Sequence, residues 1–211
     1  MTDKWAAWLL TRRDGDSPVI RERHAPGLAA FRDGVLDRAG LRPGDVLLDV
    51  GAGTGLIGFG ALDRVGPRGR VIFSDVSPEL LDECRRAAAG DERCSFVRAP
   101  ADDLAAVPDA SVDVVTTRSV LIYVSRKRAA FAEFRRVLRP GGRLSLFEPV
   151  NRFVAEHRPD DLFGLGPGPV GELLLKVRAQ FPDSGPMVDF DERDLLRWAL
   201  EAGFEAVEVE L

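Results

Sequence analysis

The chain has 211 residues, of which 45% are hydrophobic and 30% are charged, and its formal net charge is −5 at pH 7. This length supports one core that buries about 70% of the unfolded chain's surface, so we expect a single domain with an elaboration. The negative charge argues against nucleic acid as a partner, because nucleic-acid-binding surfaces need clustered Lys and Arg. A small diffusible substrate fits this composition better.

Cysteine usage and the length of the apolar runs bear on the compartment. Cys84 and Cys94 show neither a metal-ligand spacing nor a CxxC pattern, so we expect reduced thiols without a chemical role and no metal site. The apolar runs are shorter than the roughly 18 residues of a membrane span, and Trp5 to Leu10 is too short for the core of a signal peptide. We therefore expect a cytoplasmic protein that does not bind membranes.

The first 40 residues contain amphipathic stretches that predict helices. One stretch places Trp5, Trp8 and Leu9 on a single helical face, and a second carries apolar residues between Leu28 and Leu36. We interpret residues 1–40 as an N-terminal helical cap and residues 41–211 as the main domain.

In the main domain, short apolar runs alternate with amphipathic runs. The apolar runs are bounded by turn residues, which is typical of strands buried on both faces. The predicted strands are Val46–Val50, Val71–Phe73, Ser95–Val97, Val112–Val115 and Leu144–Phe147. The predicted helices are Leu56–Val65, Pro78–Ala89, Arg126–Leu138 and Asp191–Ala202. This alternation predicts an α/β fold with a doubly wound, mainly parallel sheet, helices on both faces, and a ligand site at the carboxyl ends of the strands.

The segment VLLDVGAGTGLIG, from Val46 to Gly58, connects the first strand to the helix after it. It has glycines at 51, 53 and 55, which permit close approaches that a Cβ would block, so the loop can touch a ligand with its own backbone. Read from Gly53, GTGLIG also satisfies the GxGxxG dinucleotide fingerprint. The phasing opposes a dinucleotide, because the first glycine of that fingerprint directly follows the strand, and that residue here is Gly51.

An aspartate closes the second strand, VIFSD, about 20 residues beyond the glycine loop. At this neighbouring strand tip the carboxylate of Asp75 can accept hydrogen bonds from both hydroxyls of a ribose. The alternative is that Asp75 caps the following helix, but Ser77 is better placed for that role before Pro78. Because nicotinamide and adenosyl ligands both contain a ribose, Asp75 alone does not choose between them.

Five motifs follow one another along the chain: VLLDVGAGTG, VIFSDVSPELL, FVRAPADDL, SVDVVTTRSVLIYV and FAEFRRVLRPGGRLSLFEP. In this order they resemble the class I, Rossmann-like S-adenosylmethionine-dependent methyltransferases, in particular the small-molecule branch related to ubiquinone and menaquinone biosynthesis methyltransferases. The likeness covers residues 41–211, and its RVLRPGG turn has no counterpart in the dinucleotide fingerprint. The resemblance implies S-adenosylmethionine as cofactor, methyl transfer to an O-, N- or C-nucleophile of a small-molecule acceptor, and release of S-adenosylhomocysteine.

The resemblance also implies roles for residues around the glycine loop and the fourth strand. A group of loop residues would face or approach the methionyl part of the donor. They are Asp49, Gly51, Ala52, Gly53, Thr54 and Gly55. Just past the fourth strand, Arg118 would contact the donor or open toward the acceptor.

For the nucleoside, the resemblance implies that Asp75 holds the ribose and that Val76 packs on the adenine. The Ala101 amide would meet a ring nitrogen, and Asp102 would lie beside the exocyclic amine. The chain departs from the family at Pro100, where an acidic or amide residue is usual. That adenine contact is therefore lost, or passes to Asp102 or its neighbour.

The sulfonium already activates the methyl group, so catalysis mainly requires an acceptor atom aligned about 3 Å away, plus a base if the acceptor must lose a proton. Candidates come from the exits of the fourth and fifth strands and from the N-terminal segment. They are His24, Tyr123, Glu148, Asn151, Arg152 and His157. Histidine has a pKa of about 6.5, which suits proton removal near neutrality, although each histidine can equally be a surface or packing residue.

Two segments outside the common core are expected to select the acceptor. Trp5 and Trp8 would form part of its wall, and a Gly/Pro-containing stretch within 151–188, after the fifth strand, is typical of a lid that excludes water.

The end of the chain, Gly203 to Leu211, alternates apolar and acidic residues and predicts a sixth strand. Members of the resembled family add a seventh, antiparallel strand between the fifth and sixth. The chain is then either truncated, which we favour because an uncovered apolar edge promotes aggregation, or completed by a second copy in a homodimer.

Three functions remain open at this point. The first is a methyltransferase acting on a small organic acceptor. The second is an NAD(P)-dependent oxidoreductase. The third is a donor-binding scaffold without turnover, an option raised by Pro100 and by the absence of an obvious base.

Overall fold

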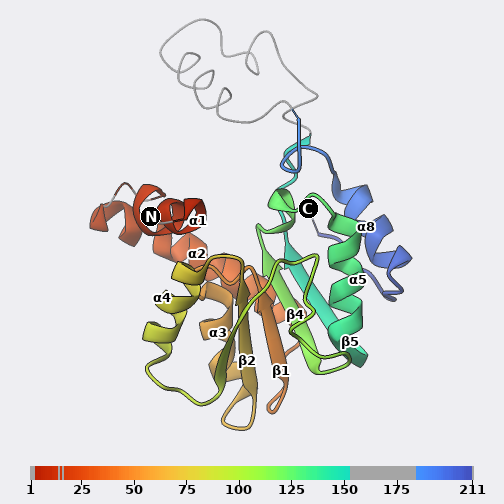
Figure 1. Ribbon diagram of the computed structural model, residues 1–211, viewed down its shortest axis with the longest axis horizontal. Coiled ribbons are helices and arrows are strands. Elements are labelled where there is room, and N and C mark those ends of the chain that lie inside the picture. Colours follow the sequence, from red (N-terminus) through yellow and green to blue (C-terminus); the bar gives the residue numbers. More distant parts are fainter. Residues whose placement is uncertain (1–2, 14, 16, 153–183, 211) are drawn as a thin grey trace, which may run out of the picture.

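The computed structural model describes residues 3–13, 15, 17–152 and 184–210 (Figure 1). Its first elements are α1 (Lys4–Ala6), the π-helix η1 (Ala7–Arg12) and the long helix α2 (Pro18–Ala39). The Ser17 hydroxyl caps α2 at its start, and Gly40 ends it in the left-handed conformation, with φ of 58°. The predicted N-terminal helical segment is confirmed.

Five strands form one parallel sheet in the order β3-β2-β1-β4-β5. Their bounds are β1 (Val46–Val50), β2 (Arg70–Asp75), β3 (Cys94–Arg98), β4 (Val112–Arg118) and β5 (Leu138–Phe147). The strand order reverses at β1, which pairs with β2 on one side and β4 on the other. This confirms the predicted doubly wound sheet and places the switch point, where such sheets bind ligands, directly after β1.

Helices cover both faces of the sheet (Figure 1). Helices α2, α3 (Leu56–Val65) and α4 (Pro78–Ala88) lie on one side, while α5 (Lys127–Val137) and α8 (Glu192–Glu201) lie on the other. A 3₁₀ turn, η2 (Leu121–Tyr123), follows β4. The ends of all four predicted helices lie within one residue of the observed ends. The side chains of Ser77 and Asp191 cap the starts of α4 and α8.

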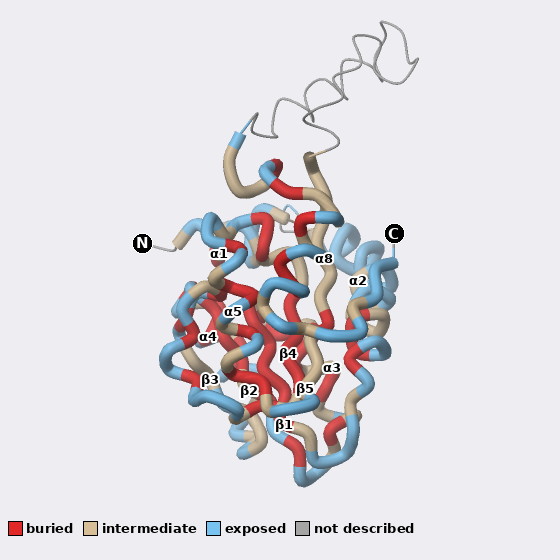
Figure 2. Tube along the Cα trace, turned by 90° about the vertical axis from the view of Figure 1, so that its right-hand side faces the viewer, coloured by how far each residue is buried: buried red, intermediate tan, exposed pale blue. Residues whose placement is uncertain are grey.

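Strand β1 is buried along its whole length, as Figure 2 shows in red. Val46, Leu48 and Val50 belong to the core cluster under α5 and α8, and Leu47 belongs to the cluster under α2 and α3. This is the period-two alternation of a strand with both faces covered. The C-terminal end of α2 contributes Ala39 to the same core, so α2 packs as an integral layer of the sheet domain.

Strand β5 begins at Leu138, earlier than the predicted Leu144. Helix α5 ends at Val137, and Leu138 is already extended and pairs with Val112. A register shift between Val112 and Val114 then accommodates the Pro-Gly-Gly turn. The chain therefore enters the strand directly from the helix, without an intervening loop.

The predicted sixth strand is wrong for the residues that can be described, because 203–210 contain no strand. Ala206 has a φ of 51°, in the left-handed region, and this conformation interrupts an extended chain. Phe204 and Val207 still pack against the core, so the apolar alternation reflects burial of a coil segment.

Residues 153–183, which include most of the predicted lid and His157, lie outside the described residues. Within the described ranges, no helix is both long enough and apolar enough to cross a bilayer.

A pair of glycine substitutions tests the packing of α3 on the sheet. A Cβ at Gly58 would lie 2.3 Å from Cε1 of Phe73, so Gly58→Ala should lower the free energy of unfolding by about 1–3 kcal/mol. Gly27 in α2 has no neighbouring atom within 4 Å of such a Cβ, and Gly27→Ala should raise that free energy by about 0.5–1 kcal/mol. Urea unfolding followed by circular dichroism measures both, and effects of the same sign would contradict this packing.

Candidate functional site

A cavity of about 930 Å³ opens at the carboxyl ends of β1, β2 and β4. Its walls come from the loops after these strands and from the N-terminal helices. The cavity contains every predicted donor-binding residue except Gly55: Asp49, Gly51, Ala52, Gly53, Thr54, Asp75, Val76, Ala101, Asp102 and Arg118. Residues widely separated in sequence therefore meet at the switch point of the sheet.

The glycine loop after β1 is shaped by tight contacts. Gly51 has a φ of 66°, and a Cβ there would lie only 2.2 Å from Cγ2 of Val120. Gly55, also in the left-handed region, turns toward the core, because a Cβ would lie 2.3 Å from Cε2 of Phe59. The loop thus presents bare backbone to the cavity on one side and packs without space on the other.

Two carboxylates support the loop from below. The carboxylate of Asp75 accepts hydrogen bonds from the Gly53 amide at 2.8 Å and from the Ser77 amide at 2.9 Å. The carboxylate of Asp49 accepts one from the Gly58 amide at 3.0 Å and one from the Thr116 hydroxyl at 3.1 Å. Asp49 and Asp75 therefore tie the loop, the start of α3 and the tip of β2 into one unit.

Burial raises the pKa of both carboxylates, Asp49 and Asp75. It raises the pKa of Asp49 to about 7, against the hydrogen bonds from Thr116 and Gly58, and the charge of Asp75 adds to the increase. Burial likewise raises the pKa of Asp75 above its usual value, against the amides of Ser77 and Gly53. A cationic ligand beside Asp49 would reverse part of this effect by favouring the ionised form.

Cys84 lies beneath the loop and donates its thiol hydrogen to the Gly53 carbonyl at 3.3 Å. Burial raises the pKa of this thiol to about 12, and the charge of Asp49 adds to the shift. Cys84 is therefore an unreactive packing group. Both cysteines of the chain are free.

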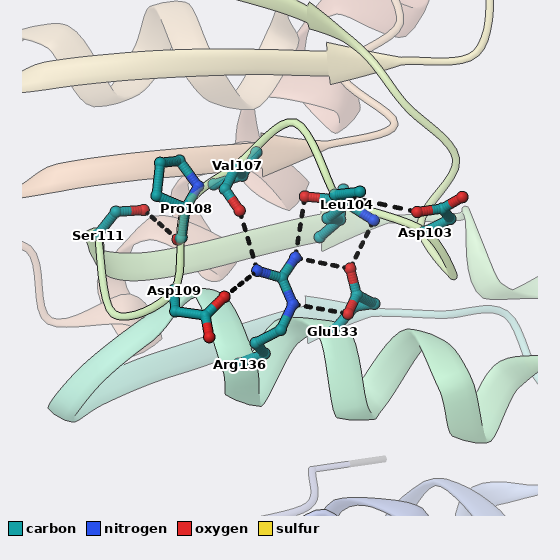
Figure 3. A network of polar contacts seen from close by, with 9 residues as sticks. Asp103, Leu104, Val107, Pro108, Asp109, Ser111, Glu133 and Arg136 are labelled. Carbon is teal, nitrogen blue, oxygen red and sulfur yellow. Dashed lines mark hydrogen bonds and ion pairs between the residues drawn. The ribbon is translucent and has the colours of Figure 1, made fainter.

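The wall of the cavity beyond β3 is held in place by Arg136 of α5 (Figure 3). Its guanidinium donates to the carbonyls of Leu104 and Val107 at 2.9 and 3.0 Å, and pairs with Glu133 at 2.7 Å. Glu133 in turn accepts a hydrogen bond from the Leu104 amide at 2.6 Å. This network holds residues 104–109, which directly follow the predicted adenine contacts at Ala101 and Asp102.

At those contacts, the Ala101 side chain is buried at 5% exposure. The Asp102 carboxylate accepts a hydrogen bond from Nε of Arg126 at 2.8 Å, so its charge is compensated at the rim. Pro100 lines the cavity and has no amide hydrogen to offer.

The N-terminal helices cover the cavity through a contact that the sequence did not indicate. The Asp3 carboxylate accepts hydrogen bonds from the amides of Trp5 and Ala6, capping α1, and from the hydroxyl of Ser77 at 2.5 Å. This bond anchors α1 beside Asp75. Trp5 then stacks at a tilt on Tyr123, with their ring centroids 4.6 Å apart, and forms an aromatic wall.

Arg118 lies at the end of β4 with its guanidinium carbon 5.3 Å from the centre of the Phe31 ring. Burial lowers the pKa of Arg118, the nearby charge of Arg13 lowers it further, and Glu148 opposes both effects. The next residue, Ser119, has a φ of 54°, which is costly for a residue with a side chain. This strained turn directs the chain from β4 across the cavity.

The catalytic candidates do not converge on one point. Tyr123 lines the cavity, whereas neither Glu148 nor His24 belongs to the described lining, and His24 is exposed on α2. The carboxylate of Glu148 instead accepts hydrogen bonds from the amides of Val120 and Ile122 at 2.9 and 3.3 Å, so it caps η2. Burial raises the pKa of Glu148 to about 7, opposed by these amides.

Two further catalytic candidates, Asn151 and Arg152, follow the fifth strand. Asn151 is half-buried and does not belong to the described lining of the cavity. Arg152 extends to α8 and contacts the carboxylate of Asp194 at 3.4 Å. Residue 157 lies outside the described ranges.

Several lining residues were missed from the sequence. Arg13, Leu28, Ser119, Ile122 and Pro149 all line the cavity. Leu28 belongs to an apolar stripe that the sequence showed, but the stripe alone does not distinguish core from cavity. Arg13 gave no local signal, because its place depends on how η1 docks over the sheet.

The chain is similar in sequence to known methyltransferases. A family model described as a methyltransferase domain matches residues 48–146. The ubiquinone/menaquinone biosynthesis C-methyltransferase UbiE of Pseudomonas putida is 31% identical over 182 residues, covering 82% of this chain and 70% of that protein. An arsenite methyltransferase of Halobacterium salinarum is 33% identical over 177 residues, covering 81% of this chain and 40% of that protein.

Solved structures share the fold. A complex between the Haloferax volcanii Trm112 methyltransferase activator and a methyltransferase matches with a TM-score of 0.68 at 22% identity, covering 99% of this chain and 79% of that chain. The chain spans about a third to two fifths of the length of the first curated relatives that it matches.

The parallel sheet and the cavity at its switch point have the class I, Rossmann-like methyltransferase fold. The chain belongs to the methyltransferase family that includes the ubiquinone/menaquinone biosynthesis C-methyltransferases. These matches confirm the family resemblance seen in the motifs.

The raised pKa of Asp49 predicts a pH-dependent effect on stability. Folded Asp49 keeps its proton until about pH 7, whereas the unfolded chain releases it near 3.8, so this group's stabilising contribution is lost as pH rises between these values. Asp49→Asn removes the titration and keeps an oxygen for the Gly58 amide. Relative to the unaltered protein, the variant should gain about 1 kcal/mol or more between pH 5 and pH 8. Chemical unfolding at both pH values measures this, and a difference that is independent of pH would contradict the raised pKa of Asp49.

Proposed function

We propose that the protein binds S-adenosylmethionine in the cavity after β1, β2 and β4 and transfers its methyl group to a small-molecule acceptor, releasing S-adenosylhomocysteine. The observation that carries this proposal is the bare backbone of the glycine loop facing a cavity that also holds Asp75 at the neighbouring strand tip. Bound there, the donor supplies an activated methyl group on its sulfonium.

Residues at one end of the cavity fit the adenosyl part of the donor. The carboxylate of Asp75 has lone pairs left for the ribose hydroxyls after accepting from two amides, since each oxygen can accept twice. Val76 is 42% exposed at this end and offers an apolar surface to a base. Ala101 and Asp102 also line the cavity, and the segment that follows them is bonded to Arg136 at Leu104. Asp49 would favour the positive charge of the donor once ionised.

Aromatic residues of the lining fit the acceptor. Trp5, Trp8 and Tyr123 come from the cap and from η2, and give the cavity an aromatic wall. Burial raises the pKa of Tyr123, with a further contribution from Glu148, so its hydroxyl keeps its proton near neutrality. We therefore propose that Tyr123 positions the acceptor by contact or by donating a hydrogen bond, and that it does not act as a base.

We propose the cap, residues 1–40, as the part that closes the cavity, and the cytoplasm as the compartment, which the two free cysteines support. Among the described strands, β5 pairs only with β4, so its other edge could pair with a second copy of the chain in a homodimer.

Donor binding can be tested directly. Titration calorimetry should show that S-adenosylhomocysteine binds and that NAD does not compete with it, because the loop phasing and the family both favour the adenosyl donor. Transfer of isotope from a labelled methyl group into a compound of an acceptor library then separates an enzyme from a donor-binding scaffold. Binding of NAD alone would refute the proposal.

The role of Asp75 gives a quantitative test. Asp75→Ala should weaken S-adenosylhomocysteine binding by about 1.5–3 kcal/mol, the size of hydrogen bonds to a charged group. It should also lower the melting temperature, because the amides of Gly53 and Ser77 lose their acceptor. The exposed Asp63→Ala is the matched control and should change neither quantity. Unchanged affinity in Asp75→Ala would mean that the ribose lies elsewhere.

A further inference from the structure

One cation in the cavity lacks the partners that the other buried charges have. Within the described part of the chain, the guanidinium of Arg118 forms no hydrogen bond or ion pair, and its Nε is buried without a partner. By contrast, Asp49 and Asp75 are each held by two donors, and Asp102 is paired with Arg126. A partly buried charge without hydrogen bonds is costly, so it is expected where a ligand completes it.

The groups that face Arg118 leave it positive. The Phe31 ring lies 5.3 Å from its guanidinium carbon and supports a cation without neutralising it. Arg13, directly after η1, lines the same cavity and is near enough to lower the pKa of Arg118. Glu148 attracts Arg118, but its carboxylate oxygens are already turned to the amides of Val120 and Ile122.

The charges of the cavity therefore differ between the two sides of β1. Asp75 lies at the tip of β2 on one side, and Arg118 lies at the end of β4 on the other. S-adenosylmethionine itself has a net positive charge, so it does not balance the charge of Arg118. An acceptor with a negative charge would balance it.

Resting on the proposed function, we propose that the acceptor is a small molecule with an apolar body and a carboxylate, and that Arg118 determines specificity by binding this carboxylate. The planar fork of one guanidinium matches a planar carboxylate through two parallel hydrogen bonds. Trp5 and Tyr123 contact the apolar body. Arg13 adds long-range attraction for the same charge.

The test uses acid and amide pairs that differ only in charge. Binding of 1-naphthoate, 1-naphthamide, indole-3-acetate and indole-3-acetamide is measured by calorimetry on protein saturated with S-adenosylhomocysteine. In at least one pair the acid should bind about tenfold or more tightly than its amide, the effect of a charged hydrogen bond. Added salt should weaken binding of the acid and leave the amide unchanged. Equal affinity for acid and amide in both pairs overturns the inference.

Variants then assign the preference to Arg118. Arg118→Gln should abolish the preference for the acid, and Arg118→Lys should retain part of it, because the ammonium keeps the charge but loses the fork. Arg86→Gln, an exposed arginine on α4, is the matched control and should behave as the unaltered protein. A preference that survives in Arg118→Gln at full size overturns the role of Arg118.

A last experiment tests whether Arg118 binds the carboxylate of the acceptor or the carboxylate of the donor. The donor product has its own carboxylate, whereas 5′-methylthioadenosine has none. If Arg118→Gln weakens S-adenosylhomocysteine by about tenfold and leaves 5′-methylthioadenosine unchanged, Arg118 binds the donor carboxylate, and this inference fails while the methyltransferase function stands. If S-adenosylhomocysteine does not bind to the unaltered protein, the proposed function itself fails. We expect both nucleosides to bind Arg118→Gln within about twofold of the unaltered protein, since the lost group belongs to the acceptor site.

Discussion

The hydrogen bond from the Gly53 amide to the Asp75 carboxylate is the contact on which the site depends. It joins the loop after β1 to the tip of β2, two segments that parallel pairing brings to the same edge of the sheet. Because the carboxylate also accepts from Ser77, the start of α4 is held in the same unit. A buried acid without these amides would be expensive, and a glycine loop without the acid would have no fixed shape.

The fold was predictable from the sequence because its signals are local and repeated. Short apolar runs between amphipathic helices specify a buried parallel sheet, and the caps at Ser77 and Asp191 set helix starts through side chains adjacent to them. The early start of β5 was not predictable, since it depends on pairing of Leu138 with Val112 across the sheet. The alternation after Gly203 was misleading for a related reason: apolar residues that pack on a core look alike in strand and coil.

The sequence likewise predicts some residues of the site and not others. The glycine loop and Asp75 were identifiable because each follows directly from a strand end. Glu148 also ends a strand, yet its side chain turns to backbone amides, and no sequence pattern distinguishes that orientation from one into the cavity. Arg13 reaches the site through the docking of η1, a tertiary contact made by Asp3 and Ser77. Position in a topology can be read from sequence, whereas the direction of a side chain depends on its neighbours.

The contact between Asp3 and Ser77 has a practical consequence for protein production. It places the third residue of the chain against the hydroxyl that caps α4, two positions from Asp75. Any polypeptide fused ahead of this residue would therefore lie near the corner at which we propose that the nucleoside binds. Binding constants of a tagged protein should be compared with those measured after the tag is cleaved.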